Sequence, residues 1–350
     1  MAVNAGKSGT LLYLLHGGEV RYGDPISFKG LNLFPLFTFR PAPFEYVLLA
    51  QAVAAGTFVI EELGRGTVPT LRVVNKGDRP VLLVDGEHLV GVKQNRVLNT
   101  TMLVPEKTAL DIPVSCVERG RWSAPRDAAR PVSPGLFVGA RAAQAEAVTA
   151  SVRDSGVYKS DQNMIWARVD DTLSSLSAVS PTSAMHAAYE QRAGDLGEYL
   201  DHLRWQPGQT GVVAGVGGRI VCADLFDRPS TLEALWERLI PSYAVEAMSK
   251  RDWLGRTVEA FSGGGGVTAA AAQAEAFLRG VRDATITEHP AIGRGTDLRI
   301  TGDGLVGAAL EVDGAIVHLA MFRTEGRGQW RITQPPFATM AERRMRFPQS

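Results

Sequence analysis

Two-residue turns between short apolar runs constrain the fold of this chain more than any other feature. The turns are Asp85-Gly86, Gly217-Gly218 and Asp313-Gly314. A type I′ turn needs a positive φ at both central residues, so these pairs favour tight antiparallel hairpins. The apolar runs beside them are residues 81–84 and 87–92, 211–216 and 219–226, and 307–312 and 315–322. The sequence therefore predicts three β-hairpins.

The second and third hairpins share one layout. Gly211 aligns with Gly307 and Phe226 with Phe322, and the positions between them coincide without a gap. The match has two readings: an internal repeat, or two hairpins that look alike because their turns are similar. The segments between them that have helical patterns are residues 232–248 and 267–282. This part of the chain therefore reads as a hairpin, helices and a second hairpin.

The first third of the chain predicts a β-rich domain. Short runs of alternating or wholly apolar residues recur there, and turn residues separate them. These runs are residues 57–63, 68–75, 81–84, 97–104 and 108–117. Their spacing is typical of a β-sandwich or a partly closed barrel. Pro35 favours an edge strand or an extended segment for residues 31–39, because proline has no N–H to offer to a central ladder.

These patterns together predict an α+β fold. A β-sandwich-like or partly closed barrel domain, residues 1–125, carries the polar motif described below. A linker and helical segment at 126–206 leads to an α+β domain with two similar hairpins at 207–335. Residues 336–350 form a tail.

Charge and composition argue against several classes of protein. The 37 basic residues balance the 37 acidic ones and form no long run, so we expect binding neither to nucleic acid nor to a membrane surface. No apolar run is long enough to span a bilayer, and two cysteines are too few for a disulfide framework. We therefore expect a cytoplasmic protein. Abundant Ala, Gly and Arg are typical of bacteria, and the oligomeric state stays open.

One polar stretch, residues 87–99, is out of place in a predicted sheet. Lys, Gln, Asn and Arg follow one another there, a succession that suits a strand poorly. Arg and Lys offer charge-assisted bonds to phosphate or carboxylate groups, and Gln and Asn offer directional amide bonds. We therefore expect a small anionic or nucleotide-like ligand; a solvated edge or a buried structural network are the alternatives. The candidate ligand-binding residues are Lys93, Gln94, Asn95, Arg96 and Asn99.

A second stretch, residues 112–122, adds charged and aromatic side chains. Cys116 shares a face with apolar neighbours, which predicts a packed core thiol rather than a nucleophile. Glu118 is either an acid/base group or an ion-pair partner of Arg121. Trp122 either stacks on a ligand or plugs the end of the sandwich. We take Arg121 and Trp122 as further ligand-binding candidates.

The sequence contains none of the common cofactor and metal signatures. It has no GxxxxGK[ST] phosphate loop, no HExxH and no cysteine pairs at zinc spacing. The histidines are scattered, so their spacing predicts no metal site. No cofactor is indicated.

Three segments carry a resemblance to a known family. They are VLLVDGE at 81–87, GVKQNRVLN at 91–99 and PVSCVERGRW at 113–122. The pattern resembles the ARG-and-rhodanese-phosphatase-associated protein domain family of bacteria, and LFPL at 33–36 and ADLF at 223–226 also fit it. The family's neighbours are ADP-ribosylglycohydrolases and rhodanese-phosphatase proteins, which implies a role near NAD or ADP-ribose metabolism. The resemblance implies no catalytic residues.

Three hypotheses about function follow. In the first, an enzyme acts on a nucleotide-like or ADP-ribose-related anion, with Glu87 or Glu118 transferring protons while the basic side chains hold the anion. In the second, the same residues bind such a ligand without catalysis. In the third, the chain is a structural or interaction protein and the motif is a hydrogen-bonded scaffold. The first is favoured, because so many polar side chains in a strand region are unfavourable unless they are used.

Overall fold

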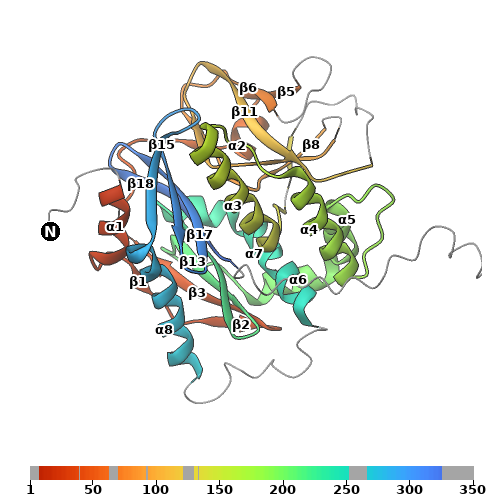
Figure 1. The fold of residues 1–350 in the computed structure, drawn as a ribbon, viewed down its shortest axis with the longest axis vertical. Helices are drawn as coiled ribbons and strands as arrows, with labels where there is room; N and C mark the ends of the chain where they lie inside the picture. The colour runs from red at the N-terminus through yellow and green to blue at the C-terminus, as the bar shows by residue number, and fades with distance from the viewer. Residues whose placement is uncertain are drawn as a thin grey trace, which may run out of the picture.

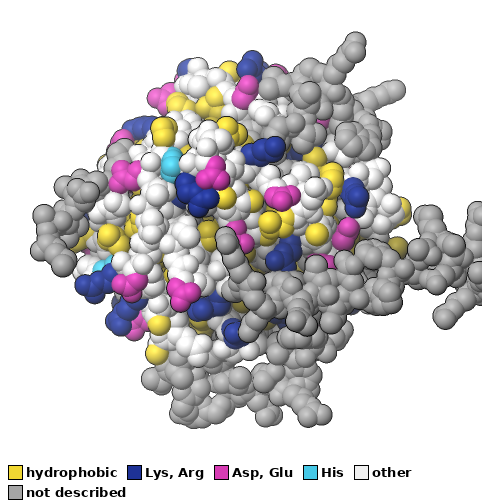
Figure 2. All heavy atoms as spheres, in the orientation of Figure 1, with side chains coloured by type: hydrophobic (Ala, Val, Ile, Leu, Met, Phe, Trp, Pro, Cys, Tyr) yellow, Lys and Arg dark blue, Asp and Glu magenta, His cyan; other side chains and the backbone are white. Residues whose placement is uncertain are grey.

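The computed structural model describes residues 8–38, 40–62, 70–91, 94–120, 130–132, 134–251 and 266–324. The predicted α+β fold is confirmed, because mainly antiparallel sheets and packed helices together build this part of the chain (Figure 1). None of the described helices combines the length and apolar character that crossing a bilayer requires. Figure 2 shows basic and acidic side chains interspersed over the described part of one face, in keeping with the balanced charge.

The largest sheet contains strands from distant parts of the chain. Within the described residues it has nine strands, each antiparallel to its neighbours. In spatial order they are β1 (Arg21–Tyr22), β3 (Leu31–Phe37), β13 (Gly211–Val216), β14 (Arg219–Phe226), β18 (Ala315–Arg323), β17 (Leu305–Val312), β16 (Thr296–Gly302) and β15 (Thr285–Pro290), with β2 (Ile26–Phe28) beside β3.

Two hairpins form the centre of this sheet, as their turns predict. Gly217 and Gly218 have φ of 55° and 78°. Asp313 and Gly314 have φ of 51° and 83°, so both turns have the two positive values of type I′. β14 pairs with β18, which places the hairpins next to each other. The equivalent register shifts, one in each hairpin, lie at Ala214/Gly215 and Leu310/Glu311. The shared layout is confirmed.

Helices cover both faces of the large sheet (Figure 1). Neighbouring residues of β18 point into different cores, Val317 into the first and Ile316 into the second. The helices that pack into the first core are α3 (Val138–Ser155), α4 (Gln162–Ser175), α5 (His186–Gln191), α6 (Ala193–His202) and α7 (Pro229–Arg251). Those of the second are α1 (Ser8–His16) and α8 (Gly266–Arg279).

Two smaller sheets share one apolar core, as the sandwich-like domain predicts. The first contains β10 (Met102–Val104), β7 (Val81–Leu83) and β4 (Val47–Leu48). The second contains β12 (Arg130–Val132), β8 (His88–Val90), β9 (Arg96–Leu98), β11 (Thr108–Cys116), β6 (Thr70–Asn75) and β5 (Phe58–Glu62). The short helix α2 (Leu49–Ala54) packs into the same core. Residues 81–84 are fully buried, as expected of an all-apolar run.

The predicted hairpin across Asp85-Gly86 is wrong. β7 pairs with β10 and β4, whereas β8 pairs with β9 and β12, so the two runs lie in different sheets. Of the two turn residues only Gly86 has a positive φ, of 71°, and a type I′ turn needs two. Glu87 Oε2 accepts a 2.7 Å hydrogen bond from the N–H of Val84, which stabilises the turn from one sheet into the other.

Of the two alternatives for residues 31–39, the edge strand is wrong, because the extended segment β3 has partners on both sides. β3 pairs with β13 on one side, where Pro35 lies opposite Val212. On the other side β1 pairs with residues 36–37 and β2 with 31–33, so Pro35 falls in a gap between two short strands. A residue without an N–H fits this gap. The β3–β13 pairing joins the predicted first domain to the sheet of the last third, and the domain boundaries at 125 and 206 stay predictions.

Candidate functional site

The structure places the predicted site residues in separate surroundings. Lys93, Arg121 and Trp122 lie outside the described residues. The remaining six occupy a turn, a buried thiol cluster, the wall of a small inner cavity and an open cleft.

Glu87 lies in the turn between β7 and β8 and is almost fully buried. Besides its bond to Val84, its Oε1 lies 3.2 Å from Nη1 of Arg238 on α7. Burial raises the pKa of Glu87 above its usual value, and the charge of Arg238 opposes this rise. Both carboxylate oxygens are therefore engaged by protein groups. The catalytic role of Glu87 stays a prediction.

Gln94 and Arg96 surround the thiol of Cys116. The thiol donates to Gln94 Oε1 over 3.0 Å, and Arg96 Nη1 contacts its sulfur. Gln162 of α4 holds the backbone of Cys116, because its side chain accepts from the N–H and donates to the C=O, at 2.7 Å each. Burial lowers the pKa of Arg96. Cys116 is 1% exposed, so the predicted packed thiol is confirmed.

Asn99 joins the β-rich region to the helices. Its Oδ1 accepts hydrogen bonds from Ser115 Oγ at 2.6 Å and from Gln144 Nε2 of α3 at 3.0 Å. Its Nδ2 donates to the C=O of Tyr158 at 3.0 Å. The side chain is 3% exposed and also borders the inner cavity described below. Its contacts within the protein are those of a buried structural amide, and a ligand-binding role stays a prediction.

Five polar residues form what we call the inner cluster: Asp85, Thr101, Arg141, Asp224 and His318. Arg141 of α3 donates from Nη2 and Nη1 to the two oxygens of Asp224 at 2.7 and 3.0 Å. Its Nε donates to Asp85 Oδ2 at 3.0 Å. His318 Nδ1 lies 2.7 Å from Thr101 Oγ1, and its Nε2 lies 3.3 Å from Asp224 Oδ1. The cluster therefore connects the turn after β7, helix α3 and two neighbouring strands of the large sheet.

Opposite charges determine the ionisation of the inner cluster. Burial opposes ionisation of Asp85 and Asp224, but the charge of Arg141 and the contacts of His318 outweigh it and lower both pKa values. Burial also opposes the charge of Arg141, yet the two carboxylates raise its pKa. The cluster therefore contains two ionised carboxylates around one fixed cation.

The inner cluster has the ligand types that bind a metal ion. Within the described residues, ligand atoms of Asp85, Asp224 and His318 all lie within 4.8 Å of one another. However, the guanidinium of Arg141 already forms ion pairs with both carboxylates. A metal cation at this place would have to displace Arg141, so the cluster is better suited to its internal ion pairs.

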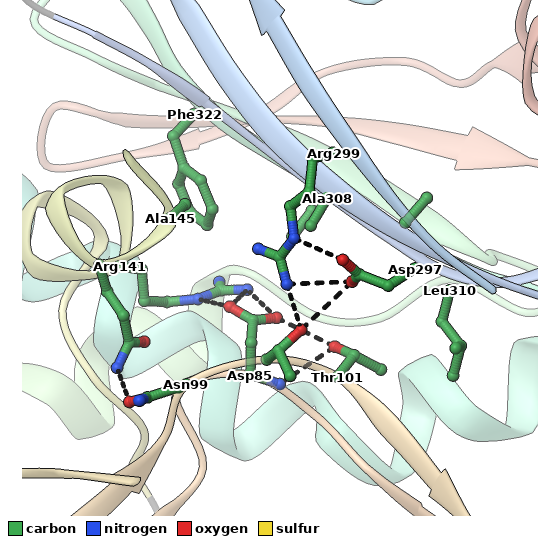
Figure 3. A pocket seen from close by; sticks show the side chains of 14 residues that line it. Asp85, Asn99, Thr101, Arg141, Ala145, Asp297, Arg299, Ala308, Leu310 and Phe322 are labelled. Carbon is green, nitrogen blue, oxygen red and sulfur yellow. Dashed lines mark hydrogen bonds and ion pairs between the residues drawn. The ribbon is translucent and has the colours of Figure 1, made fainter. Parts of the chain in front are cut away.

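A narrow cavity of about 20 Å³ borders the inner cluster (Figure 3). Its opposite wall is an ion pair in β16, where Arg299 Nε lies 2.6 Å from Asp297 Oδ2. Arg299 also donates to Thr100 Oγ1 at 2.6 Å. In Figure 3 the side chains of Asp85, Asp297 and Arg299 converge on this space. Such a volume holds about one water molecule, so a nucleotide does not fit there.

A much larger open cleft, of about 570 Å³, lies between β8, β12 and α5. We call it the outer cleft. It brings two predicted residues, Asn95 and Glu118, to one opening. Its polar lining residues are Asn95, Glu118, Arg130, Ser180, His186, Glu190 and Gln191. The volume is within the range of about 300–1,000 Å³ that is usual for small-molecule sites.

Contacts with the segment before α5 position the acidic groups of the outer cleft. Glu118 Oε1 accepts a hydrogen bond from Thr182 Oγ1 at 3.0 Å, and its backbone forms a β-bridge with Ala184. His186 Nε2 lies 3.3 Å from Glu190 Oε1, one helical turn further along α5. The cleft therefore presents a carboxylate, a carboxylate–imidazole pair and the cation of Arg130.

The comparison with protein families identifies the chain. The model of the ARG and Rhodanese-Phosphatase-superfamily-associated Protein domain, ARPP-1, matches residues 19–322. The chain belongs to the ARPP-1 family. No curated protein and no solved structure matches it. The matched range contains the inner cluster and the outer cleft.

The ARPP-1 domain contains buried charges that sequence patterns do not single out. Arg141 lies in an Ala-rich helix, where an arginine is ordinary. Asp224 lies in the second predicted hairpin, and the structure pairs it with Arg141. His318 lies in the third predicted hairpin and is 1% exposed. The signal that marks Asp224 and His318 is a titratable residue inside an apolar run, which is unfavourable unless it is paired.

Proposed function

We propose that this ARPP-1 protein is an enzyme that acts on a small anionic molecule, nucleotide-like or related to ADP-ribose, in the outer cleft. One observation carries the proposal: a cleft of about 570 Å³ gathers Asn95 and Glu118 beside Arg130 and His186. These side chains supply a cation, an amide and a carboxylate, which can bind an acidic substrate, orient it and exchange a proton with it.

Each of these side chains has a distinct role in the proposal. Arg130 binds the phosphate or carboxylate of the substrate, because guanidinium groups form charge-assisted hydrogen bonds with such anions. Asn95 orients the substrate through its amide. Glu118, held by Thr182, is the acid/base group. His186 and Glu190 pair with each other in the wall of the cleft.

The family description and the cysteines bear on the proposed substrate class and compartment. The family description links the domain to ARG proteins, which the resemblance described above connects with ADP-ribose. Both cysteines are free thiols, which suits the reducing cytoplasm. A non-catalytic ligand-binding module is the second candidate. It is favoured by the low exposure of Glu118, 6%, which limits its access to a substrate.

A ligand screen with matched variants tests the proposal. The probes are ADP-ribose, NAD, AMP and ribose 5-phosphate, with binding followed by thermal shift and turnover by chromatography of the products. We expect stabilisation by at least one probe and formation of product. Glu118→Gln should bind that probe but lose turnover, and Arg130→Gln should weaken binding. Glu233→Gln, on the exposed side of α7, is the matched control and should behave as the unchanged protein.

Three outcomes decide between the hypotheses. Stabilisation without any product supports the ligand-binding module. No stabilisation by any probe supports the structural reading. Equal turnover by the unchanged protein and Glu118→Gln removes Glu118 from the mechanism.

A further inference from the structure

His88, the first residue of β8, is 0% exposed. Neither of its ring nitrogens has a hydrogen-bond partner among the described residues. A neutral imidazole has one donor and one acceptor, and burying both unpaired is unfavourable. Such a residue points to a missing ligand or a functional constraint.

The ring of His186 lies next to that of His88. The two ring centroids are 5.8 Å apart and the planes are inclined by 48°. His186 Nδ1 is also buried and without a hydrogen-bond partner in the described part of the chain. Its other nitrogen, Nε2, is occupied by Glu190 at 3.3 Å. A histidine whose outer nitrogen is held by a carboxylate while the inner one is free has the arrangement of a metal-bound histidine.

We propose that His88 and His186 together bind one divalent transition-metal ion, of the zinc class, next to the outer cleft that His186 lines. Imidazole nitrogens suit zinc, copper, cobalt and nickel. Two imidazoles leave coordination positions that water or an anionic oxygen completes. The site is separate from the inner cluster, where Arg141 already forms ion pairs with the carboxylates.

Both unpaired nitrogens of His88 are buried, and imidazole binds metal ions as the neutral ring. The proposal does not depend on the identity of the substrate, since the two histidines bind the ion without it.

Metal titration of the full chain tests the site. The protein is stripped with EDTA and dialysed, and then titrated with Zn²⁺ by calorimetry and with Co²⁺ by visible absorption. We expect one equivalent of each ion, with a Co²⁺ spectrum altered by nitrogen ligands. His186→Gln should abolish this binding, and Glu190→Gln should weaken it about 10- to 100-fold because it removes the partner of the ligating ring.

The controls separate loss of ligands from loss of fold. His202→Gln removes an exposed histidine and should keep the full equivalent. His88→Gln should also lose binding, and a thermal melt without metal checks its fold because the site is fully buried. His186 is half-buried, so its variant gives the decisive result if His88→Gln does not fold. The proposal is overturned if the unchanged protein takes up no equivalent, or if His186→Gln binds as tightly as His202→Gln. The ligand screen with ADP-ribose, NAD, AMP and ribose 5-phosphate is run on metal-free protein. Its outcome therefore does not depend on whether the two histidines bind a metal ion.

Discussion

Arg141 forms ion pairs with two carboxylates that come from different sheets of the molecule. It is 2% exposed, and its partners Asp85 and Asp224 belong to the turn after β7 and to β14. A buried ion pair contributes little compared with an apolar replacement, but removing one partner leaves an uncompensated charge and is strongly destabilising. Single substitutions in the inner cluster should therefore be costly for folding.

Asp224→Asn tests this at the residue scale. We expect the free energy of unfolding at pH 7 to fall by about 3–5 kcal/mol, because Arg141 loses the charge of its bidentate partner. The native pKa of Asp224 is lowered from 3.8, so its ionised form stabilises the fold above that pH. The stabilisation is lost as the pH falls below 3.8 towards the native pKa. The difference in the free energy of unfolding between Asp224→Asn and the unchanged protein should therefore become smaller as the pH is lowered.

Urea unfolding from pH 7 down to pH 3 measures both effects. Asp201→Asn, an exposed aspartate on α6, is the control and should leave the curve nearly unchanged. Parallel stability curves for Asp224→Asn and the unchanged protein across this range would contradict the electrostatic account.

At the scale of single residues, the sequence identifies polar side chains but does not identify their hydrogen-bond partners. The packed thiol of Cys116 is predictable because apolar neighbours alternate with it in the sequence. The environment of Asn99 is not, since Gln144 and Tyr158 follow it by more than forty residues. Such contacts depend on how α3 packs, and no local pattern encodes that.

At the scale of elements, two equivalent glycines allow the central strands to approach closely. A Cβ atom at Gly211 would lie 2.8 Å from the backbone oxygen of Asp224. A Cβ atom at Gly307 would lie 2.7 Å from the backbone oxygen of Ala320. Both distances are shorter than a normal contact, so the paired strand would have to move. The alignment of these glycines therefore has a physical cause in the sheet.

Gly307→Ala should destabilise the protein by about 1–3 kcal/mol, the usual effect of overpacking. The matched control is Gly215→Ala in β13, where the nearest atom to a new Cβ lies at 3.4 Å, an ordinary contact. Chemical denaturation of the two variants measures the difference. Equal stabilities would show that the strands adjust without strain.

The three turns explain which elements the sequence predicts well. Gly217-Gly218 and Asp313-Gly314 both adopt two positive φ values, so local turn chemistry forms those hairpins. Asp85-Gly86 has the same two residues as Asp313-Gly314 but only one positive φ. Here the N–H of Val84 donates to Glu87, and β7 and β8 each pair with strands from elsewhere in the chain. Turn composition predicts a hairpin only where the two strands have no better partners.

At the scale of the whole molecule, the large sheet joins segments that sequence reasoning assigns to separate domains. β3 pairs with β13 along its length, and the inner cluster connects Asp85 with β14 and β18. The α+β class is predictable from short local patterns. The β3–β13 pairing is not, because it joins segments more than 170 residues apart and both are simply apolar runs.

We therefore expect the chain to unfold as one unit. Calorimetry should give a single transition, and residues 1–206 and 207–350 expressed separately should not fold, since each would expose an unpaired strand of the large sheet. Mixing the two pieces should restore the circular dichroism of the intact chain. A well-dispersed NMR spectrum from either piece alone would argue for independent domains.

The pairing of β14 with β18 places Asp224 directly opposite Ala320, at the same position in each hairpin. Side chains opposite each other on antiparallel strands project from the same face, about 5 Å apart. The two hairpins therefore have two equivalent positions for a carboxylate, and only the position of Asp224 holds one. Exchanging the two side chains would shift the negative charge across a local two-fold axis without altering composition. Arg141 of helix α3 would then meet its counter-charge at the position that this two-fold axis relates to the first.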